Sequence, residues 1–179
     1  GEVSTPAAAT ERVWDPFVRL FHWSLVVCVL LNLWVVEDGE PLHEWLGYTA
    51  SALVGARIVW GLVGTRHARF TDFWPTPARL SRHLRALWRG EPEHHAGHNP
   101  LGAVMVLGLM ALVLALGLTG WLQTTDVFWG VDWMEDLHEA LAEVLMPMVG
   151  LHAVAALVMG RLERTRLIKA MVTGVKERY

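Results

Sequence analysis

The residues best suited to chemistry in this chain are four histidines in or beside long apolar segments: His22, His43, His138 and His152. Ionisable side chains are rare at membrane depth, and those present usually mark a functional site. His138 and His152 are fourteen residues apart. One helix therefore presents both on the same face, about 21 Å apart along its axis. Two ligands stacked on one face indicate two stacked cofactors. Each cofactor needs a second ligand from another helix, and His22 and His43 are available for this role.

The composition predicts an integral membrane protein. Of the 179 residues, 53% are hydrophobic, and the segment 101–122 carries no charge. A helix of that length spans the roughly 30 Å of hydrocarbon in a bilayer. These features exclude a soluble globular domain.

We expect one domain, residues 1–179, folded as an all-α four-helix membrane bundle. A long polar loop, residues 64–99, separates the second and third spans, and its segment 77–89 has the pattern of a basic amphipathic helix on the inner leaflet. Asn99 followed by Pro100 is a typical start for the third helix. The four expected spans are 17–36, 42–63, 101–122 and 136–160.

The distribution of charge predicts the orientation. Lysine and arginine gather before the first span, in loop 64–99 and in the tail from Arg161 onward. The other two loops, 37–41 and 123–135, contain six acids and no lysine or arginine. By the positive-inside rule, both termini and loop 64–99 are cytoplasmic. The polar residues 1–13 are expected to be poorly ordered.

This orientation sorts the four histidines into two pairs at matched depths. The first span runs outward and the fourth runs inward, so His22 and His152 both lie toward the cytoplasmic side. His43 opens the second span and His138 opens the fourth, which places both near the outer side. The sequence therefore predicts the pairs His22/His152 and His43/His138.

Paired imidazoles on facing helices suit the axial ligation of a haem iron in an apolar pocket. With both axial positions filled, no site stays open for oxygen, which favours electron transfer. Zinc and copper need more ligands at one point than either pair offers. The chain has no C-x-x-C-H motif, which excludes covalent c-type attachment. The alternative interpretation is that the histidines serve only in packing and hydrogen bonding.

Arg57 follows His43 by fourteen residues, so it lies on the same helix face and toward the cytoplasmic side. There it is a candidate partner for a haem propionate. The alternative is a side chain that snorkels to the lipid headgroups.

The remaining histidines lie in the long polar loop. We expect His67 and His83 to be solvated. His94, His95 and His98 cluster just before the third span, where they form a metal-binding group, a proton relay or simply a polar linker.

Motifs spread over nearly the whole chain carry a family resemblance. They are Val13–Arg19, Phe21–Trp23, Leu42–Glu44, Arg57–Gly64, Gly97–Gly102, Thr119–Gly120, Leu137–Glu139, His152 and Ala170–Gly174. In these stretches the chain resembles the bacterial di-haem cytochrome b-561 family, and within it the membrane cytochrome b subunit of nickel-iron hydrogenases. The resemblance implies two haem b groups that exchange electrons with a membrane quinone and a redox partner. Hydrogenase subunits often carry a fifth span or a longer tail, from which this chain departs.

The working hypothesis is a multi-pass cytochrome b of the bacterial inner membrane that connects a periplasmic redox partner with the quinone pool. We expect it to act as an electron-transfer subunit of an oxidoreductase system rather than as a stand-alone enzyme. Arg57 and His98 are candidate polar groups for the quinone. The expected partners are membrane lipid, quinone and a c-type cytochrome or hydrogenase-like redox subunit, without nucleic acid, and a homo-oligomer stays open.

Two other functions compete with this hypothesis. A superoxide oxidase that reduces ubiquinone ranks second, because its outer mouth would carry positive charge to attract the anion and this chain has none there. A haem-free membrane scaffold or assembly subunit ranks third.

Overall fold

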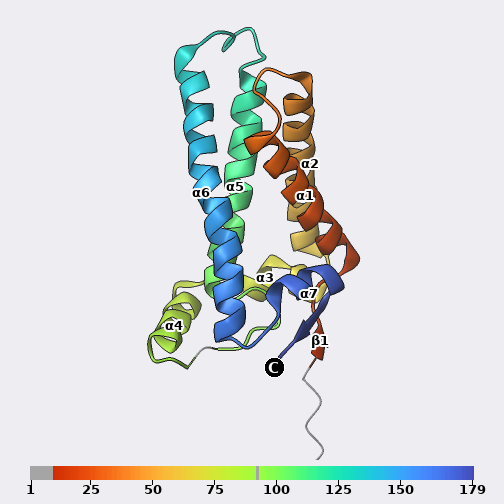
Figure 1. Cartoon of the computed structure of the whole chain (residues 1–179), viewed down its shortest axis with the longest axis vertical. Helices are drawn as coiled ribbons and strands as arrows, with labels where there is room; N and C mark the ends of the chain where they lie inside the picture. Colours follow the sequence, from red (N-terminus) through yellow and green to blue (C-terminus); the bar gives the residue numbers. More distant parts are fainter. Residues whose placement is uncertain (1–9, 92) are drawn as a thin grey trace, which may run out of the picture.

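The structure, a computed structural model, describes residues 10–91 and 93–179 (Figure 1). Four long helices dominate it, and each is long and apolar enough to cross a membrane. The all-α membrane bundle is therefore confirmed. The helices are α1 (Pro16–Trp34), α2 (Pro41–Val63), α5 (Pro100–Leu122) and α6 (Asp132–Leu162).

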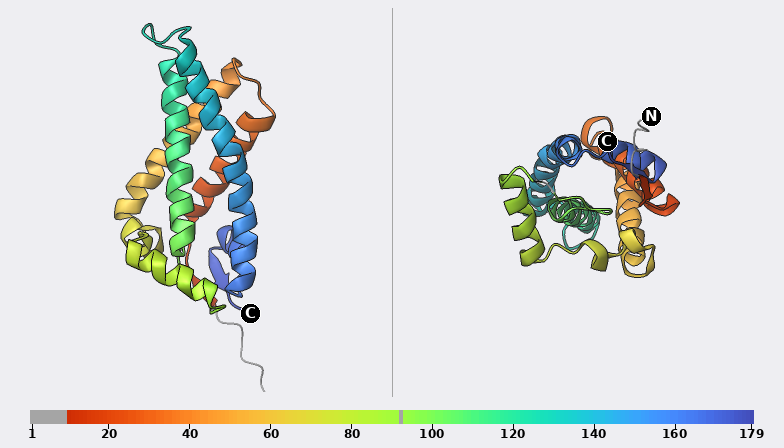
Figure 2. Two further views of the ribbon diagram at one scale, coloured as in Figure 1. Left: turned by 90° about the vertical axis from the view of Figure 1, so that its left-hand side faces the viewer. Right: turned by 90° about the horizontal axis from the view of Figure 1, so that it is seen from below.

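The long helices pack in a chain rather than a closed ring. Helix α1 packs on α2, α2 on α5, and α5 on α6, whereas α6 makes no extended contact with α1 or α2 within the described residues. Figures 1 and 2 show α6 standing across from α1. The bundle therefore has one seam, between α6 and the α1–α2 pair, that helix–helix contacts do not close.

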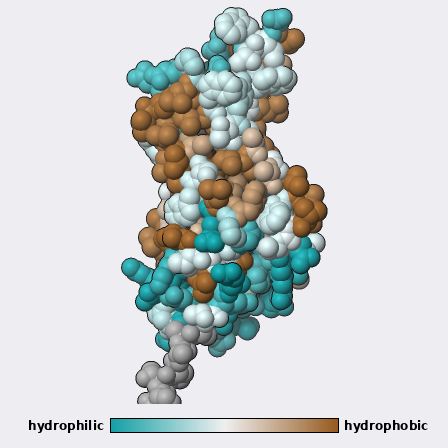
Figure 3. Space-filling view, turned by 90° about the vertical axis from the view of Figure 1, so that its right-hand side faces the viewer, coloured by the Kyte–Doolittle hydropathy of each residue, from teal (hydrophilic) through white to brown (hydrophobic). Residues whose placement is uncertain are grey.

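Apolar side chains cover the middle of the molecule, and hydrophilic ones gather toward its ends, most of all at the lower end in this view (Figure 3). Large apolar residues such as Leu20, Val27 and Leu151 are more than half exposed. In water such a surface would drive aggregation, whereas in lipid it is the ordinary outer face of a membrane helix.

The short elements gather at the end of the bundle where residue 10, the first described residue, and the C-terminus lie, here called the terminal end (Figure 1). The opposite end, with loops 35–40 and 123–131, is called the distal end. The short elements are β1 (Thr10–Arg12), η1 (Arg66–Ala68), α3 (Phe70–Phe73), α4 (Pro77–Trp88), α7 (Leu167–Thr173) and β2 (Val175–Glu177).

The expectation of poor order for residues 1–13 is wrong for residues 10–13, and residues 1–9 lie outside the described residues. Strand β1 pairs antiparallel with β2, close to the C-terminus. Beyond the strand, the backbone amides of Val13 and Trp14 donate to the carbonyl of Gly174 at 2.8 and 3.1 Å. Gly174 has φ +83°, a left-handed conformation that glycine adopts without strain. Residues 10–14 and 174–177 therefore hold each other in place beneath the bundle.

Side-chain caps fix where two of the long helices begin. The Oδ1 atom of Asp15 accepts from the amide of Val18 at 2.9 Å and caps α1. Its Oδ2 accepts from Trp60 Nε1 at 2.9 Å and from the Thr65 hydroxyl. Burial by itself raises the pKa of Asp15, but these hydrogen bonds outweigh it and lower the pKa below its usual value. The carboxylate therefore ties the start of α1 to the end of α2.

Asn99 caps α5, as the sequence predicted. Its Oδ1 accepts from the amide of Gly102 at 2.7 Å, and its Nδ2 donates to the buried carboxylate of Glu163 at 3.2 Å. Burial raises the pKa of Glu163, although the Asn99 hydrogen bond opposes it. The cap thus also joins the start of α5 to the end of α6.

The predicted amphipathic helix is present as α4, with its apolar face uncovered: the exposed fraction is 93% at Trp88 and 47% at Leu84. Two expectations for the long loop are wrong. His83, expected in solvent, is fully buried. His67, also expected there, is largely buried, and its Nδ1 lies 3.3 Å from Asp72. Both errors arise because the loop folds back on itself beneath the bundle instead of lying open.

Candidate cofactor-binding sites

The structure brings together His22 of α1 and His152 of α6 at the terminal end of the bundle. Their ring centroids are 6.3 Å apart, with 56° between the ring planes. Buried Nδ1 of His22 has no hydrogen-bond partner in the described part of the chain. We call these two residues the terminal pair.

His43 of α2 and His138 of α6 form a second pair nearer the distal end. Their ring centroids are 6.4 Å apart, with 80° between the ring planes. We call these residues the distal pair. Both pairs reach across the seam that α6 forms with α1 and α2, so that two imidazole rings lie near each other where the helices do not pack.

The separation within each pair has a direct chemical meaning. Two imidazoles that share one metal ion, with metal–nitrogen bonds of about 2 Å, place their ring centroids roughly 6 Å apart. Both pairs have this separation, which is too long for a hydrogen bond between the rings. The separation within each pair would therefore suit one metal centre held by both imidazoles.

A threonine orients one ring of the distal pair. Thr119 Oγ1 lies 2.8 Å from His138 Nδ1 and donates its own proton to the carbonyl of Ala115, also at 2.8 Å. With the hydroxyl proton on this carbonyl, the threonine oxygen accepts from the tautomer of His138 that carries its proton on Nδ1, and that tautomer leaves the lone pair of Nε2 free for a metal. Gly120 leaves room for the ring, because a Cβ atom there would lie 3.3 Å from His138 Cε1.

Sequence reasoning assigned no role to Thr119, although one signal was available. Thr119 is the only hydroxyl side chain in the uncharged segment 101–122. A lone polar group in such a segment requires a partner inside the bundle.

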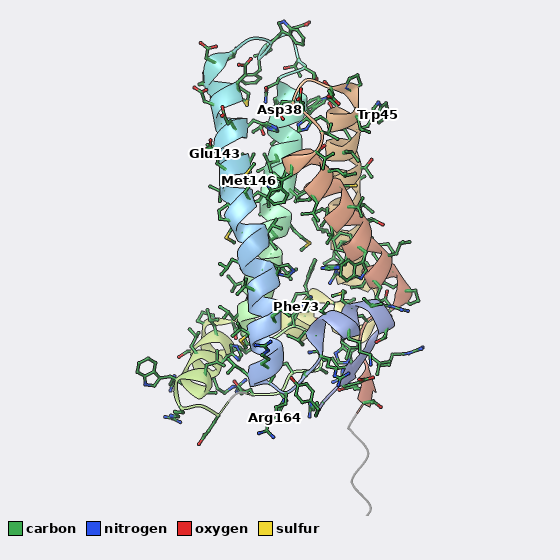
Figure 4. The ribbon with its side chains drawn as sticks, viewed as in Figure 1. Asp38, Trp45, Phe73, Glu143, Met146 and Arg164 are labelled. Carbon is green, nitrogen blue, oxygen red and sulfur yellow. The ribbon has the colours of Figure 1, made fainter. Side chains whose placement is uncertain are left out.

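Two neighbours contact His43, the other residue of the distal pair. Asn32 Nδ2 donates to the backbone carbonyl of His43 at 3.0 Å and so couples α1 to the start of α2. His43 Nε2 lies 3.5 Å from the Asp38 carboxylate, whose side chain is 90% exposed. Figure 4 shows Asp38 in the loop at this end of the molecule. A metal at His43 Nε2 requires only that this exposed carboxylate turn toward solvent.

Removing the Thr119 hydroxyl is expected to weaken the distal site alone. Thr119→Val keeps the size of the side chain but deletes the acceptor for His138 Nδ1–H, and loss of such a supporting group typically costs about 10–100-fold in metal affinity. The measurement is the rate of cofactor loss to an apo-globin acceptor. Thr49→Val is the matched control, because the exposed Thr49 donates its hydroxyl proton to the carbonyl of Trp45 in its own helix. Equal rates in the two variants would contradict the orienting role.

Arg57 lies in the core at the terminal end, with 2% of its surface exposed. This burial contradicts the snorkelling alternative. Its guanidinium carbon lies 5.4 Å from the ring centroid of Phe70 and 6.0 Å from that of Phe73, and Figure 4 shows Phe73 at the base of the long helices. Neither terminal nitrogen, Nη1 or Nη2, has a hydrogen-bond partner in the described part of the chain. A buried guanidinium with two free donor nitrogens fits an anionic group that binds between them.

His98 shares this end of the bundle. Its ring packs between Trp14 and Phe73, at centroid distances of 4.7 and 4.9 Å. Burial, together with the nearby charge of Arg57, lowers the pKa of His98 to about 3. The ring is therefore neutral at pH 7. His94, in contrast, is exposed, and His95 belongs to a separate group.

Comparison with protein-family models gives one match, to prokaryotic cytochrome b561, over residues 13–174. Comparison with curated proteins and with solved structures gives no match. The matched residues span almost the whole chain and include all four long helices and both histidine pairs. The chain therefore belongs to the prokaryotic cytochrome b561 family of multi-pass, haem b-binding electron-transfer proteins of the inner membrane.

Proposed function

We propose that the chain carries two b-type haems, one ligated by His22 and His152 and the other by His43 and His138. The observation that carries this proposal is the repeated spacing of 6.3 and 6.4 Å within the two pairs. One helix, α6, supplies a ligand to each site. An isolated packing histidine would not explain why two pairs repeat one metal-bridging distance.

The residues around each pair have distinct roles in this proposal. Haem would supply a one-electron couple at its iron, and the two histidines of each pair would hold that iron and leave no site for dioxygen. The Thr119 hydroxyl keeps His138 in the tautomer that binds metal. Arg57 pairs with a haem propionate at the terminal site, where its free nitrogen atoms otherwise lack an acceptor.

The two sites form an electron path along the bundle. The positive-inside rule places the terminal end in the cytoplasm and the distal end in the periplasm. The distal loops carry acids such as Glu37, Glu40 and Asp126 without lysine or arginine, which suits docking of a basic surface on a periplasmic partner such as a c-type cytochrome. Arg57 and His98 are the polar groups that we assign to a quinone near the terminal site.

Quinol-driven reduction tests this function. In proteoliposomes that contain the purified protein, ubiquinol is expected to reduce both haems, and an oxidised c-type cytochrome outside is expected to reoxidise them. The readout is the reduced-minus-oxidised absorbance of the b-type haems. Full reduction by dithionite without any reduction by ubiquinol or menaquinol would contradict the link to the quinone pool.

The superoxide oxidase alternative remains second. Superoxide is an anion, and an enzyme that collects it benefits from positive charge around the entrance. The distal loops have the opposite sign, which favours a cationic protein partner over an anionic small substrate.

A further inference from the structure

A second cluster of metal-ligating side chains lies outside the membrane spans and away from both histidine pairs. His83 comes from α4, and Glu93 and His95 come from the segment that leads into α5. One ligand atom from each residue lies within 4.8 Å of the other two. The rings of His83 and His95 are 5.6 Å apart between centroids. Three groups from two elements thus converge on one point.

Four buried polar atoms of this cluster have no hydrogen-bond partner in the part of the chain that the structure describes. His83 has no exposed surface, yet both of its ring nitrogens are unpaired. His95 Nε2 and Glu93 Oε1 are also buried and unpaired. Buried polar groups nearly always find a partner, so a group of unpaired atoms that face one another indicates a missing ligand.

The chemistry of these groups selects the ligand. Two imidazole nitrogens and one carboxylate oxygen form the donor set of a zinc-type site with one further position open. Hard cations such as Mg²⁺ prefer all-oxygen coordination. Tetrahedral zinc places its ligand atoms about 3.3 Å apart, so small side-chain rotations close the present spacing around an ion. Arg82 Nε lies 3.5 Å from Glu93 Oε2, whereas the buried Oε1 has no partner in the described part of the chain and stays free for a metal ion.

We propose that His83, Glu93 and His95 bind a divalent transition-metal ion of the zinc class, which fastens α4 to the segment that enters α5. That segment is already anchored on its other side, since Lys176 Nζ of β2 donates to the carbonyls of His95 and Gly97 at 2.6 and 2.8 Å. The ion would therefore link α4 to a segment that β2 already holds. This site is independent of the haem proposal, because it shares no ligand with either histidine pair.

Zinc binding by the full-length, detergent-purified protein tests the site. After removal of bound metal with a chelator, we expect one Zn²⁺ per chain by calorimetry and by elemental analysis, without displacement by excess Mg²⁺. His83→Ala, His95→Ala and Glu93→Gln are each expected to weaken zinc binding by roughly tenfold or more. His94→Ala is the matched control, because His94 neighbours His95 but is exposed and outside the cluster.

Several outcomes would overturn the proposal. Wild-type protein that binds no zinc would show that the cluster holds no metal. His94→Ala losing as much affinity as His83→Ala would show that only surface histidines bind the metal. The haem absorbance spectrum of each variant reports whether the bundle is intact. If a histidine variant misfolds, Glu93→Gln still tests the site, because this substitution preserves the shape of the side chain. As a second readout, zinc is expected to slow proteolysis between α4 and α5 in wild type but not in Glu93→Gln. Equal slowing in both would also reject the site.

Discussion

His152→Ala is expected to halve the haem content of the purified protein while the distal haem is retained. The substitution leaves His22 as the only imidazole at the terminal site, and a haem held by one axial bond is lost far more readily than one held by two. The distal ligands, His43 and His138, are untouched. The measurements are the haem-to-chain ratio from the pyridine haemochrome and the reduced-minus-oxidised spectrum.

The converse variant makes the test specific. His43→Ala is expected to remove the distal haem and spare the terminal one, so that the two variants retain different haems with separate reduction potentials. His94→Ala serves as the control, because His94 is an exposed histidine outside both pairs. Loss of neither haem from His152→Ala, or loss of the same haem from both variants, would contradict the pairing.

The second large effect concerns charge at the terminal site. Arg57→Gln is expected to lower the reduction potential of the terminal haem, because the buried guanidinium stabilises the extra electron of the reduced form. A unit charge at roughly 10 Å contributes ~1–2 kcal/mol at an effective dielectric constant near 20, which corresponds to ~40–90 mV for a one-electron couple. The measurement is a redox titration in which the two haems are resolved.

Three comparisons make this result interpretable. The distal haem should keep its reduction potential in Arg57→Gln, because Arg57 and the distal ligand His43 lie near opposite ends of α2. Arg57→Lys should leave the reduction potential of the terminal haem close to the wild-type value, because the positive charge is kept. It should bind the haem less tightly, because lysine cannot form the paired hydrogen bonds of a guanidinium. Arg89→Gln, on the exposed end of α4, should leave both potentials unchanged. An unchanged terminal potential in Arg57→Gln would reject the propionate role.

The spans and the histidine pairs followed from local sequence for a clear physical reason. Each long helix is specified by a continuous apolar run, and a helix fixes the relative height of its own residues. The fourteen-residue spacing of His138 and His152 therefore placed them at two levels before any contact was known. Asn99 before Pro100 likewise identified the start of α5, because a helix cap depends only on its immediate neighbours.

The parts that escaped prediction depend on contacts between distant segments. Strand β1 is ordered because β2 pairs with it from the far end of the chain, and nothing near residues 10–12 reveals that partner. His83 was expected in solvent because it lies in the long polar loop, yet it is buried and the ring of His95 lies 5.6 Å from its own, between centroids. The role of the Thr119 hydroxyl depends on its contact with His138 on another helix, so the sequence around Thr119 does not reveal it.

The measurement that tests the central claim most directly is the haem-to-polypeptide ratio of the wild-type protein, combined with the electron paramagnetic resonance spectrum of its oxidised form. Two bis-histidine sites predict two b-type haems per chain, both low-spin, because each iron has strong imidazole ligands on both faces. One haem per chain, or a stoichiometric high-spin signal from an iron with an open position, would contradict the assignment of His22 with His152 and His43 with His138.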